Sequence, residues 1–254
     1  MKRLEKILSI RQSLKSGGHT IGSWMQIPHG SIAEIMGQAG YDWVAIDMEH
    51  GTISHSDLPD LFRALELGGT LPLVRLAEGH PKDCKQALDA GAGGIIVPMI
   101  ESAEQLIRVR NECRWPPAGT RGVGFSRANL FGKNFEEYKE EAQKPLLVAM
   151  IEHFRAVDKM EDILQVEGLD AIMVGPYDLS ASMGITGEFE QENFIEIMHY
   201  IQSICEKCRI RSGVHIVNPI KEMLNQRINE GYGFIAYSVD SVFLNLNVEN
   251  PAKR

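Results

Sequence analysis

The stretch DAGAGGIIVP at residues 89–98 contains the end of a helix, a glycine stop and a buried strand. A glycine after the last helical turn adopts the left-handed conformation at little steric cost. A short apolar run bounded by turn residues is typical of a strand that is buried on both faces. The same order recurs in QAGYDWVAID at 38–47, LGGTLPLVR at 67–75, VEGLDAIMVG at 166–175 and NEGYGFIAYS at 229–238. The chain therefore repeats a unit of helix, cap and strand.

Eight apolar runs are predicted to be strands, and helical patterns separate nearly all of them. They cover residues 20–26, 43–47, 72–75, 94–98, 146–152, 171–175, 213–216 and 234–238. Alternating strands and helices imply right-handed parallel crossovers, and eight such units in about 250 residues have the size of a (β/α)8 TIM barrel. We therefore expect an α/β fold with a single barrel domain over residues 1–254. An extra helix over residues 4–14 is expected to close the barrel floor.

A doubly wound sheet is the competing architecture. Its dinucleotide-binding form requires the pattern G-x-G-x-x-G after the first strand. The residues at that place, 27–34, are IPHGSIAE. The sequence therefore disfavours a dinucleotide-binding sheet.

Charge and composition restrict the partners of this protein. The 26 Lys and Arg residues against 34 Asp and Glu residues give a net charge of −8, which disfavours a nucleic-acid backbone or an anionic membrane surface. The first residues lack the apolar core of a secretory signal, and no run of about 18 apolar residues is present to span a membrane. Four cysteines in 254 residues are too few for a disulfide scaffold. We expect small-molecule partners and a cytoplasmic location.

The connection over residues 114–144 is longer than an ordinary loop between a helix and a strand. Long ordered loops in compact domains are usually lids or binding loops, so we expect a lid-like segment. Arg121 and Arg127 in this segment are candidates to hold an anionic substrate group or a carboxylate of another subunit. The alternative is a surface insertion without a function.

Ionisable residues follow several of the predicted strands. Asp47, Glu49 and His50 end the second strand region, Arg75 ends the third, and Glu152 ends the fifth. Burial of such groups at the ends of apolar strands is costly without partners. In a TIM barrel the carboxyl ends of the strands form one mouth, where catalytic residues gather. The pattern therefore predicts an active site at this mouth.

Glu152 and Asp178 are predicted to hold a divalent metal. They follow neighbouring strands, so both carboxylates can point to one place, and two carboxylates with open coordination positions suit Mg²⁺ or Mn²⁺. Adjacent residues of a strand face opposite ways, so His153 is expected to point away from the metal. The alternative is that the two carboxylates act independently, each solvated or paired in a salt bridge.

Arg75 and His50 are the candidates for the acid–base and charge-stabilising roles. A guanidinium at the mouth suits a carboxylate or the oxygen of a developing enolate, and the alternative for Arg75 is a salt bridge to Asp47 or Glu49. His50 lies beside acidic residues, and a nearby carboxylate would fix its tautomer and raise its basicity. His50 is therefore a candidate general base, although an isolated histidine is more often structural.

Six motifs in one order extend this interpretation. They are IDMEHG at 46–51, PLVR at 72–75, VPMIESAEQ at 97–105, PPAGTRGVG at 116–124, VAMIEH at 148–153 and GPYDLSASMG at 175–184. Together they resemble the HpcH/HpaI family of class II pyruvate aldolases over residues 22–246. The resemblance implies a barrel that forms a homohexamer, a trimer of dimers, with C-terminal helices exchanged between subunits. In this chain that helix would cover residues 239–248.

The resemblance also assigns roles to individual residues. It implies that Glu152 and Asp178 bind the metal, which is Mg²⁺ or Mn²⁺ with Co²⁺ as a further candidate, and that His50 and Arg75 are catalytic. The expected substrate contacts are Gly175, Pro176, Tyr177, Asp178, Met150 and Trp24. Tyr177 stands where many relatives have alanine, and Met150 stands where many have glutamine. Since a thioether cannot replace an amide donor, Met150 puts the usual substrate contact in doubt.

An aspartate that raises the basicity of the histidine is a further family feature, and it matches Asp89. We expect Asp89 at the end of a helix on the barrel floor, so it would reach His50 only from a neighbouring subunit. Asp47 is the alternative within the same subunit.

The reaction implied by the resemblance is cleavage of a 4-hydroxy-2-oxo acid to pyruvate and an aldehyde. No lysine ends a predicted strand, which is consistent with a mechanism that uses a metal rather than a Schiff base. One alternative is a related lyase that acts on a pyruvate enolate or on a CoA thioester. The other is a non-catalytic barrel that binds a metabolite.

Overall fold

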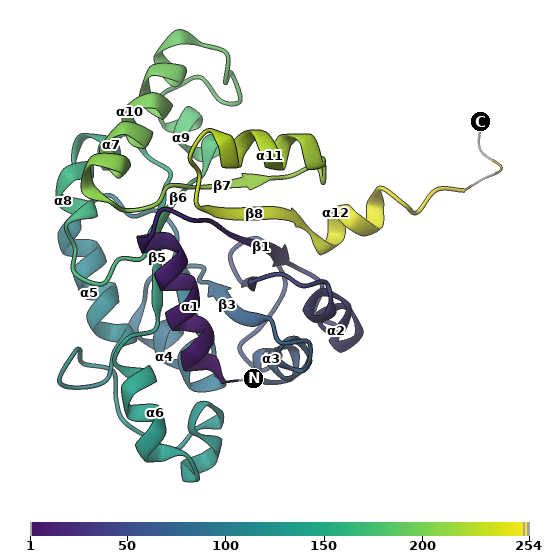
Figure 1. Cartoon of the computed structure of the whole chain (residues 1–254), viewed down its shortest axis with the longest axis vertical. Coiled ribbons are helices and arrows are strands. Elements are labelled where there is room, and N and C mark those ends of the chain that lie inside the picture. Colours follow the sequence, from purple (N-terminus) through teal and green to yellow (C-terminus); the bar gives the residue numbers. More distant parts are fainter. Residues whose placement is uncertain (1, 251, 253–254) are drawn as a thin grey trace.

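The computed structural model describes residues 2–250 and 252, and its centre is one sheet of eight parallel strands surrounded by helices (Figure 1). The strands are β1 (Thr20–Met25), β2 (Trp43–Asp47), β3 (Leu71–Arg75), β4 (Gly94–Val97), β5 (Leu146–Ile151), β6 (Ala171–Val174), β7 (Gly213–Ile216) and β8 (Phe234–Val239). Their order is β6-β5-β4-β3-β2-β1-β8-β7. A bridge between Ala171 and Arg211 joins the two ends of the sheet. The sheet is therefore a nearly closed (β/α)8 barrel, as predicted, and every strand boundary lies within one residue of the expected one.

Helices follow the strands around the outside of the barrel. They are α1 (Arg3–Lys15), α2 (Gly30–Gln38), α3 (Leu58–Leu67), α4 (Pro81–Ala90), α5 (Ala103–Cys113), the 3-10 helix η1 (Arg127–Gly132), α6 (Phe135–Ala142), α7 (Phe154–Asp158), α8 (Met160–Leu164), α9 (Pro176–Ser182), α10 (Glu192–Cys208), α11 (Lys221–Asn229) and α12 (Asp240–Asn245). Within the described residues, none of these helices is both long and apolar enough to cross a membrane. The helix α4 shows how the sequence sets the boundaries. Pro81 occupies its first turn, and Gly91 ends it with a φ of 110° in the left-handed region.

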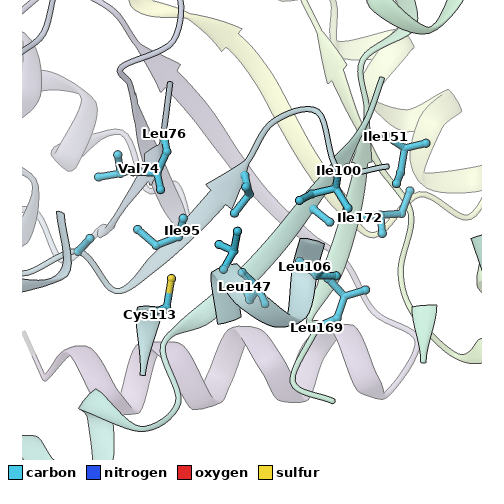
Figure 2. Packing of buried hydrophobic residues seen from close by; sticks show 14 of the residues in the cluster. Val74, Leu76, Ile95, Ile100, Leu106, Cys113, Leu147, Ile151, Leu169 and Ile172 are labelled. Atoms are coloured by element: carbon cyan, nitrogen blue, oxygen red, sulfur yellow. The ribbon is translucent and has the colours of Figure 1, made fainter. Parts of the chain in front are cut away.

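The apolar core has two layers because strand residues alternate between the two faces of the sheet. The outer layer lies between strands and helices, and Figure 2 shows Ile95 and Leu147 of neighbouring strands facing Leu106 and Cys113 of α5. The inner layer fills the barrel. There the ring of Trp43 stacks on Phe234, with centroids 4.3 Å apart and an angle of 4° between the planes.

The helix α1 closes the barrel floor, as predicted. Its buried residues Ile7, Ile10 and Leu14 pack in the same cluster as Trp43 and Leu71, which are the first residues of β2 and β3. Contacts with the first residues of strands place this helix at the end opposite the mouth.

The 114–144 connection also lies at the floor of its own barrel. Arg121 donates from Nη1 to Asp89 Oδ1 at 2.9 Å, and Arg127 donates from Nη1 to the carbonyl of Ala90 at 2.8 Å. Both partners are in the last turn of α4, directly before β4 begins. Glu66, near the end of α3, is a second partner of Arg127. Within one chain this segment therefore covers the floor and not the mouth.

The C-terminal helix is shorter than expected. α12 begins at Asp240 and ends at Asn245, whereas the sequence predicted a helix to residue 248. Leu244, Leu246 and Val248 are exposed, and the segment after α12 extends away from the barrel (Figure 1). Without a surface to bury this apolar end, the last residues do not continue the helix.

Gly22 of β1 is the position where the inner layer leaves least room. A Cβ atom at this residue would lie 2.1 Å from the ring of Trp43, which is held by its stacking on Phe234. We expect Gly22→Ala to lower the free energy of unfolding by about 2 kcal/mol or more, because overpacking forces a rigid ring to move. Gly30→Ala is the control, since a Cβ there meets nothing within 4 Å. Urea denaturation measures both, and equal stability of the two variants would contradict this account of the core.

Candidate active site

The carboxyl ends of the strands bring the predicted site residues to one mouth. Asp47 and Arg75 are the last residues of β2 and β3, and the strand register places them side by side. Glu152 follows β5 directly, and Asp178 lies in the first turn of α9, after β6. Four elements thus contribute charged groups to the same rim.

Asp47 is fully buried and accepts five hydrogen bonds. Arg75 donates from Nε at 2.9 Å and from Nη2 at 2.6 Å, and Gln26 donates from Nε2 at 2.9 Å. The backbone N–H groups of Glu49 and His50 donate to Oδ1 at 3.1 and 3.2 Å. Burial raises the pKa of Asp47, but the hydrogen bonds and charge of Arg75 and the other donors lower it by more. The pKa of Asp47 therefore lies below its usual range. Asp47 is therefore a permanent anion that shapes the turn after β2.

Arg75 forms the salt bridges that the sequence left as an alternative, and it also faces the mouth. Its guanidinium lies over the ring of Trp24 at 4.5 Å, and Nη1 is 3.2 Å from Glu49 Oε2 and 4.0 Å from Met150 Sδ. Asp47 occupies the edge formed by Nε and Nη2. Because each terminal nitrogen carries two N–H groups, Arg75 retains donors for an oxygen of a bound molecule.

Glu152 is buried next to other acidic groups. Only 3% of this residue is exposed, and its Oε2 accepts a hydrogen bond of 2.8 Å from the backbone N–H of Met99. A Cβ atom at position 175 would lie 2.7 Å from Glu152 Oε1, so Gly175 provides the space for this carboxylate. Burial, together with the negative charges of Glu49 and Asp178, raises the pKa of Glu152 to about 7.

These carboxylates fit a divalent cation. Within the part of the chain that the structure describes, no three His, Cys, Asp or Glu side chains are grouped to hold a metal ion. Glu152 and Asp178 by themselves would leave most coordination positions to water and substrate oxygens, as Mg²⁺ prefers. The negative charges of Glu49 and Asp178 help to raise the pKa of Glu152, and a positive ion bound at Glu152 and Asp178 would offset this repulsion. The donor set is therefore suited to a divalent cation that prefers oxygen ligands.

Glu49 belongs to the site, although the sequence indicated no role for it except as an alternative salt-bridge partner of Arg75. Burial and the negative charges of Asp47 and Asp178 raise its pKa to about 7, and Arg75 opposes this shift. Its place in IDMEHG, between two residues with assigned roles, was the available signal. The sequence did not show that its side chain turns into the mouth.

His50 is exposed at the rim, and its imidazole faces Glu49. Nε2 lies 3.9 Å from Glu49 Oε2, whereas Asp47 binds the backbone N–H of His50 and not its ring. Asp89 is at the floor, bound to Arg121. Within the described chain, neither expected aspartate therefore contacts the imidazole.

The other expected contact residues line different parts of the mouth. Met150 and Trp24 are buried in the inner layer below the rim and touch Arg75. Pro176 lies in the first turn of α9, and next to it Tyr177 is 61% exposed and packs edge-on against Phe189, with ring centroids 5.0 Å apart. His153 accepts a hydrogen bond from the N–H of Arg155 and caps α7, an arrangement that fits the expected orientation away from the site.

Comparison with known proteins identifies the family. Residues 20–245 match the model of the HpcH/HpaI aldolase/citrate lyase family. The chain belongs to this family. A protein of Roseobacter denitrificans named hydroxypyruvate/pyruvate aldolase is 34% identical over 241 residues, which cover 93% of this chain and 92% of that protein.

Two further comparisons support membership of the same family. A 2-keto-3-deoxy-L-rhamnonate aldolase of Salmonella gallinarum is 34% identical over 238 residues, covering 91% of this chain and 87% of that protein. A crystal structure of an HpcH/HpaI family protein from Burkholderia cenocepacia J2315 has a TM-score of 0.87 at 30% identity, covering 94% of this chain and 95% of that one. The predicted family and the predicted enzyme class, an aldehyde-lyase, are confirmed.

His215 of β7 lies inside the barrel below the mouth. Its ring centroid is 6.1 Å from that of Trp24, and its Nε2 is buried without a hydrogen-bond partner. Burial and the positive charge of Arg75 lower the pKa of His215 to about 4. The folded protein therefore keeps this imidazole neutral.

The burial of His215 predicts a loss of stability in acid. Below its usual pKa near 6.5, the unfolded chain binds a proton that the folded chain binds only near pH 4. Stability is fully present above about pH 6.5 and is lost as the pH falls toward 4; at about pH 5 the contribution of His215 is a loss of about 2 kcal/mol. We expect His215→Gln to remove this part of the loss. Urea denaturation at about pH 7.5 and pH 5 tests it, and equal losses in both proteins would contradict the prediction.

Proposed function

We propose that this protein is a divalent-metal-dependent class II aldolase that cleaves a 4-hydroxy-2-oxo acid to pyruvate and an aldehyde. The observation that carries the proposal is the buried carboxylate of Glu152 at the mouth, where the charges of Glu49 and Asp178 help to raise its pKa and Arg75 pairs with Glu49. Negative oxygen donors next to one fixed cation suit a bound 2-oxo acid and a metal ion. The aldolase names of the relatives support the same reaction class.

Glu152 and Asp178 would hold the metal, which we propose to be Mg²⁺ or Mn²⁺, with Co²⁺ as a further candidate. When bound, this ion supplies Lewis-acid charge that stabilises negative charge on the oxygens of a 2-oxo acid. Arg75 would donate to the same developing charge. Its position is fixed in advance by Asp47, so little reorganisation accompanies the reaction.

His50 would act as the general base in the cleavage direction. It removes the proton of the 4-hydroxyl group, the C3–C4 bond breaks, the aldehyde carbonyl forms, and the electron pair of the broken bond becomes the pyruvate enolate. Addition of a proton at C3 then gives pyruvate. The exposed position of His50 at the rim leaves space for the aldehyde half of the substrate.

The loop 175–178 is the proposed contact for the pyruvate carboxylate. Gly175 precedes α9, and Pro176, Tyr177 and Asp178 form its first turn at the mouth, where the backbone N–H groups of Tyr177 and Asp178 can donate to an anion. Met150 and Trp24 would line the apolar bottom of the substrate pocket at the mouth, because both touch Arg75 from inside the barrel.

We further propose a homohexamer, a trimer of dimers, in the cytoplasm. The exposed apolar residues Leu244, Leu246 and Val248 support an exchange of the C-terminal segment between subunits. Asp89 and the 114–144 connection lie at the floor, so any lid role, and any contact of Asp89 with His50, would act on the mouth of a second copy. The four free cysteines support a reducing compartment.

An assay with pyruvate and a panel of aldehydes, with Mn²⁺ and with EDTA, tests the function. We expect aldol formation with Mn²⁺ and none with EDTA, and we expect Glu152→Gln to abolish the Mn²⁺-dependent activity because a charged metal ligand is removed. Turnover only of a CoA thioester would favour the lyase alternative, and metabolite binding without turnover would favour a non-catalytic barrel.

His50→Ala separates catalysis from binding. We expect the turnover of cleavage to fall by about 100-fold or more, as is typical when a general base is removed, while Mn²⁺ binding measured by calorimetry is retained. His80→Ala is a matched control, because His80 is an exposed histidine that pairs with Glu78 after β3. Full activity of His50→Ala would refute the role of the histidine.

A further inference from the structure

The loop after β4 holds the proposed metal ligand Glu152 through a backbone group. Met99 donates its N–H to Glu152 Oε2 at 2.8 Å. On the other side of this carboxylate, a Cβ atom at position 175 would lie 2.7 Å from Oε1, so Oε1 lies against Gly175. The segment from Gly175 leads directly into the first turn of α9, which contains Asp178. One oxygen of Glu152 is therefore bound by the loop, and the other lies beside the segment that carries the second proposed ligand.

Met99 reaches Glu152 in an unfavourable backbone conformation. Its φ is 51°, in the left-handed region that a residue with a Cβ atom rarely adopts. Such a conformation persists only where the surrounding contacts determine it. The side chain of Met99 is 41% exposed, so its packing contributes little. The backbone contacts of the loop must therefore hold Met99 in this conformation.

The side chain of Gln105, in the first turn of α5, makes two of these contacts. Its Nε2 donates to the carbonyl of Met99 at 3.1 Å, and its Oε1 accepts the N–H of Glu101 at 2.9 Å. The N–H of Ile100 belongs to the same planar peptide group as the carbonyl of Met99, and it donates to the carbonyl of Met150 in β5 at 3.3 Å. The peptide group after Met99 is thus held at both ends, and it cannot rotate without breaking the bond to Gln105.

Helix capping does not explain the reach of Gln105. A glutamine at the third position of a helix usually belongs to a capping box, and Ser102 does cap α5, because its Oγ accepts the N–H of Gln105 at 3.2 Å. The amide of Gln105 nevertheless reaches past Ser102 to Glu101 and Met99. The side chain of Glu101 also pairs with Arg155 at 2.7 Å, but a solvent-exposed ion pair contributes little. Gln105 is therefore the stronger of the two holds on this loop.

We propose that Gln105 is a positioning residue for Glu152 and acts through the backbone of Met99. By holding the carbonyl of Met99, it keeps the N–H of the same residue directed at Glu152 Oε2. Oε1 then remains for a divalent cation. This inference rests on the proposed function, since it concerns how a proposed metal ligand is held.

The consequence is a carboxylate that is oriented before the cation binds. A ligand that is already fixed loses less conformational freedom on binding. Hydrogen bonds to metal-binding side chains typically change metal affinity by about 10- to 100-fold. Loss of the bond from Gln105 to Met99 should therefore weaken metal binding, although both proposed ligands remain.

Gln105→Glu is the direct test. It keeps an acceptor for the N–H of Glu101 but replaces the donor to Met99 by an oxygen, which repels the carbonyl. We expect the Kd of Mn²⁺, measured by calorimetry on the full chain at about pH 8, to rise about tenfold. This pH lies above the pKa of about 7 of Glu152. The added negative charge would by itself attract Mn²⁺ and lower the Kd, so a rise reports on lost positioning.

Two further variants separate positioning from stability. Ser102→Ala removes the cap of α5 but keeps the bond from Gln105 to Met99, so we expect a lower melting temperature and an unchanged Kd of Mn²⁺. Met99→Gly, added to Gln105→Glu, permits the left-handed conformation at little cost. We expect this double variant to recover part of the lost Mn²⁺ affinity, because glycine reaches Glu152 without help from Gln105.

A measurement without metal tests the same contact independently. The rate at which the N–H of Met99 exchanges with water is accessible by NMR on the full chain labelled with ¹⁵N-methionine, and Met99→Leu identifies the signal. We expect exchange about tenfold faster in Gln105→Glu, the scale of one lost hydrogen bond, and no change in Ser102→Ala. If the natural protein binds no Mn²⁺, the proposed function fails, and this rate still decides whether Gln105 holds Met99 on Glu152.

Four results would overturn the proposal. They are an unchanged Kd of Mn²⁺ in Gln105→Glu, an equal rise of the Kd in Ser102→Ala, an unchanged exchange rate of Met99 in Gln105→Glu, and a double variant with Met99→Gly that recovers no affinity. If Gln105→Glu does not fold, Gln105→Ala removes both contacts without adding a charge. The same rise in Kd and in exchange rate is then expected, and its absence would overturn the proposal equally.

Discussion

The ion pair between Asp47 and Arg75 is the interaction on which the mouth of this barrel depends. A buried carboxylate is unfavourable unless its oxygens are hydrogen-bonded and its charge is compensated, and Asp47 meets both conditions. The same carboxylate fixes Arg75 over Trp24 and binds the backbone of the turn after β2. One buried anion thereby sets the positions of a cation, a second carboxylate and a histidine.

The distribution of charge around the Asp47–Arg75 pair explains why the mouth is suited to bind a cation and a charged substrate. Arg75 is shared between Asp47 and Glu49, so it does not neutralise Glu152 and Asp178 as well. The positive charge of Arg75 compensates these carboxylates only in part, and burial therefore keeps the pKa values of Glu49 and Glu152 raised. Buried carboxylates with raised pKa values are typical of functional sites, where a bound cation or substrate compensates their charge.

The two ends of the barrel serve different purposes. At the floor, Arg3 of α1 pairs with Glu141 of the 114–144 connection, and Arg121 of that connection pairs with Asp89 of α4. The rings of Trp43 and Phe234, at the start of β2 and β8, stack inside the barrel at this end. These contacts stabilise the closed sheet. The mouth, at the opposite end, contains the charged residues of the candidate active site. This agrees with the division between stability and catalysis in TIM barrels.

The sequence by itself determined the fold and the membership of the mouth. Glycine stops, apolar runs and strand–helix alternation are local properties, so they predicted every strand within one residue and placed Asp47, Arg75, Glu152 and Asp178 at one rim. The contacts between these residues depend on strand register and side-chain rotamers, and only the tertiary structure decided them. It placed Glu49 and neither aspartate next to the imidazole of His50, and it placed the long connection at the floor. These contacts are made between groups on separate elements of the fold. A local sequence pattern does not contain the distances between such elements.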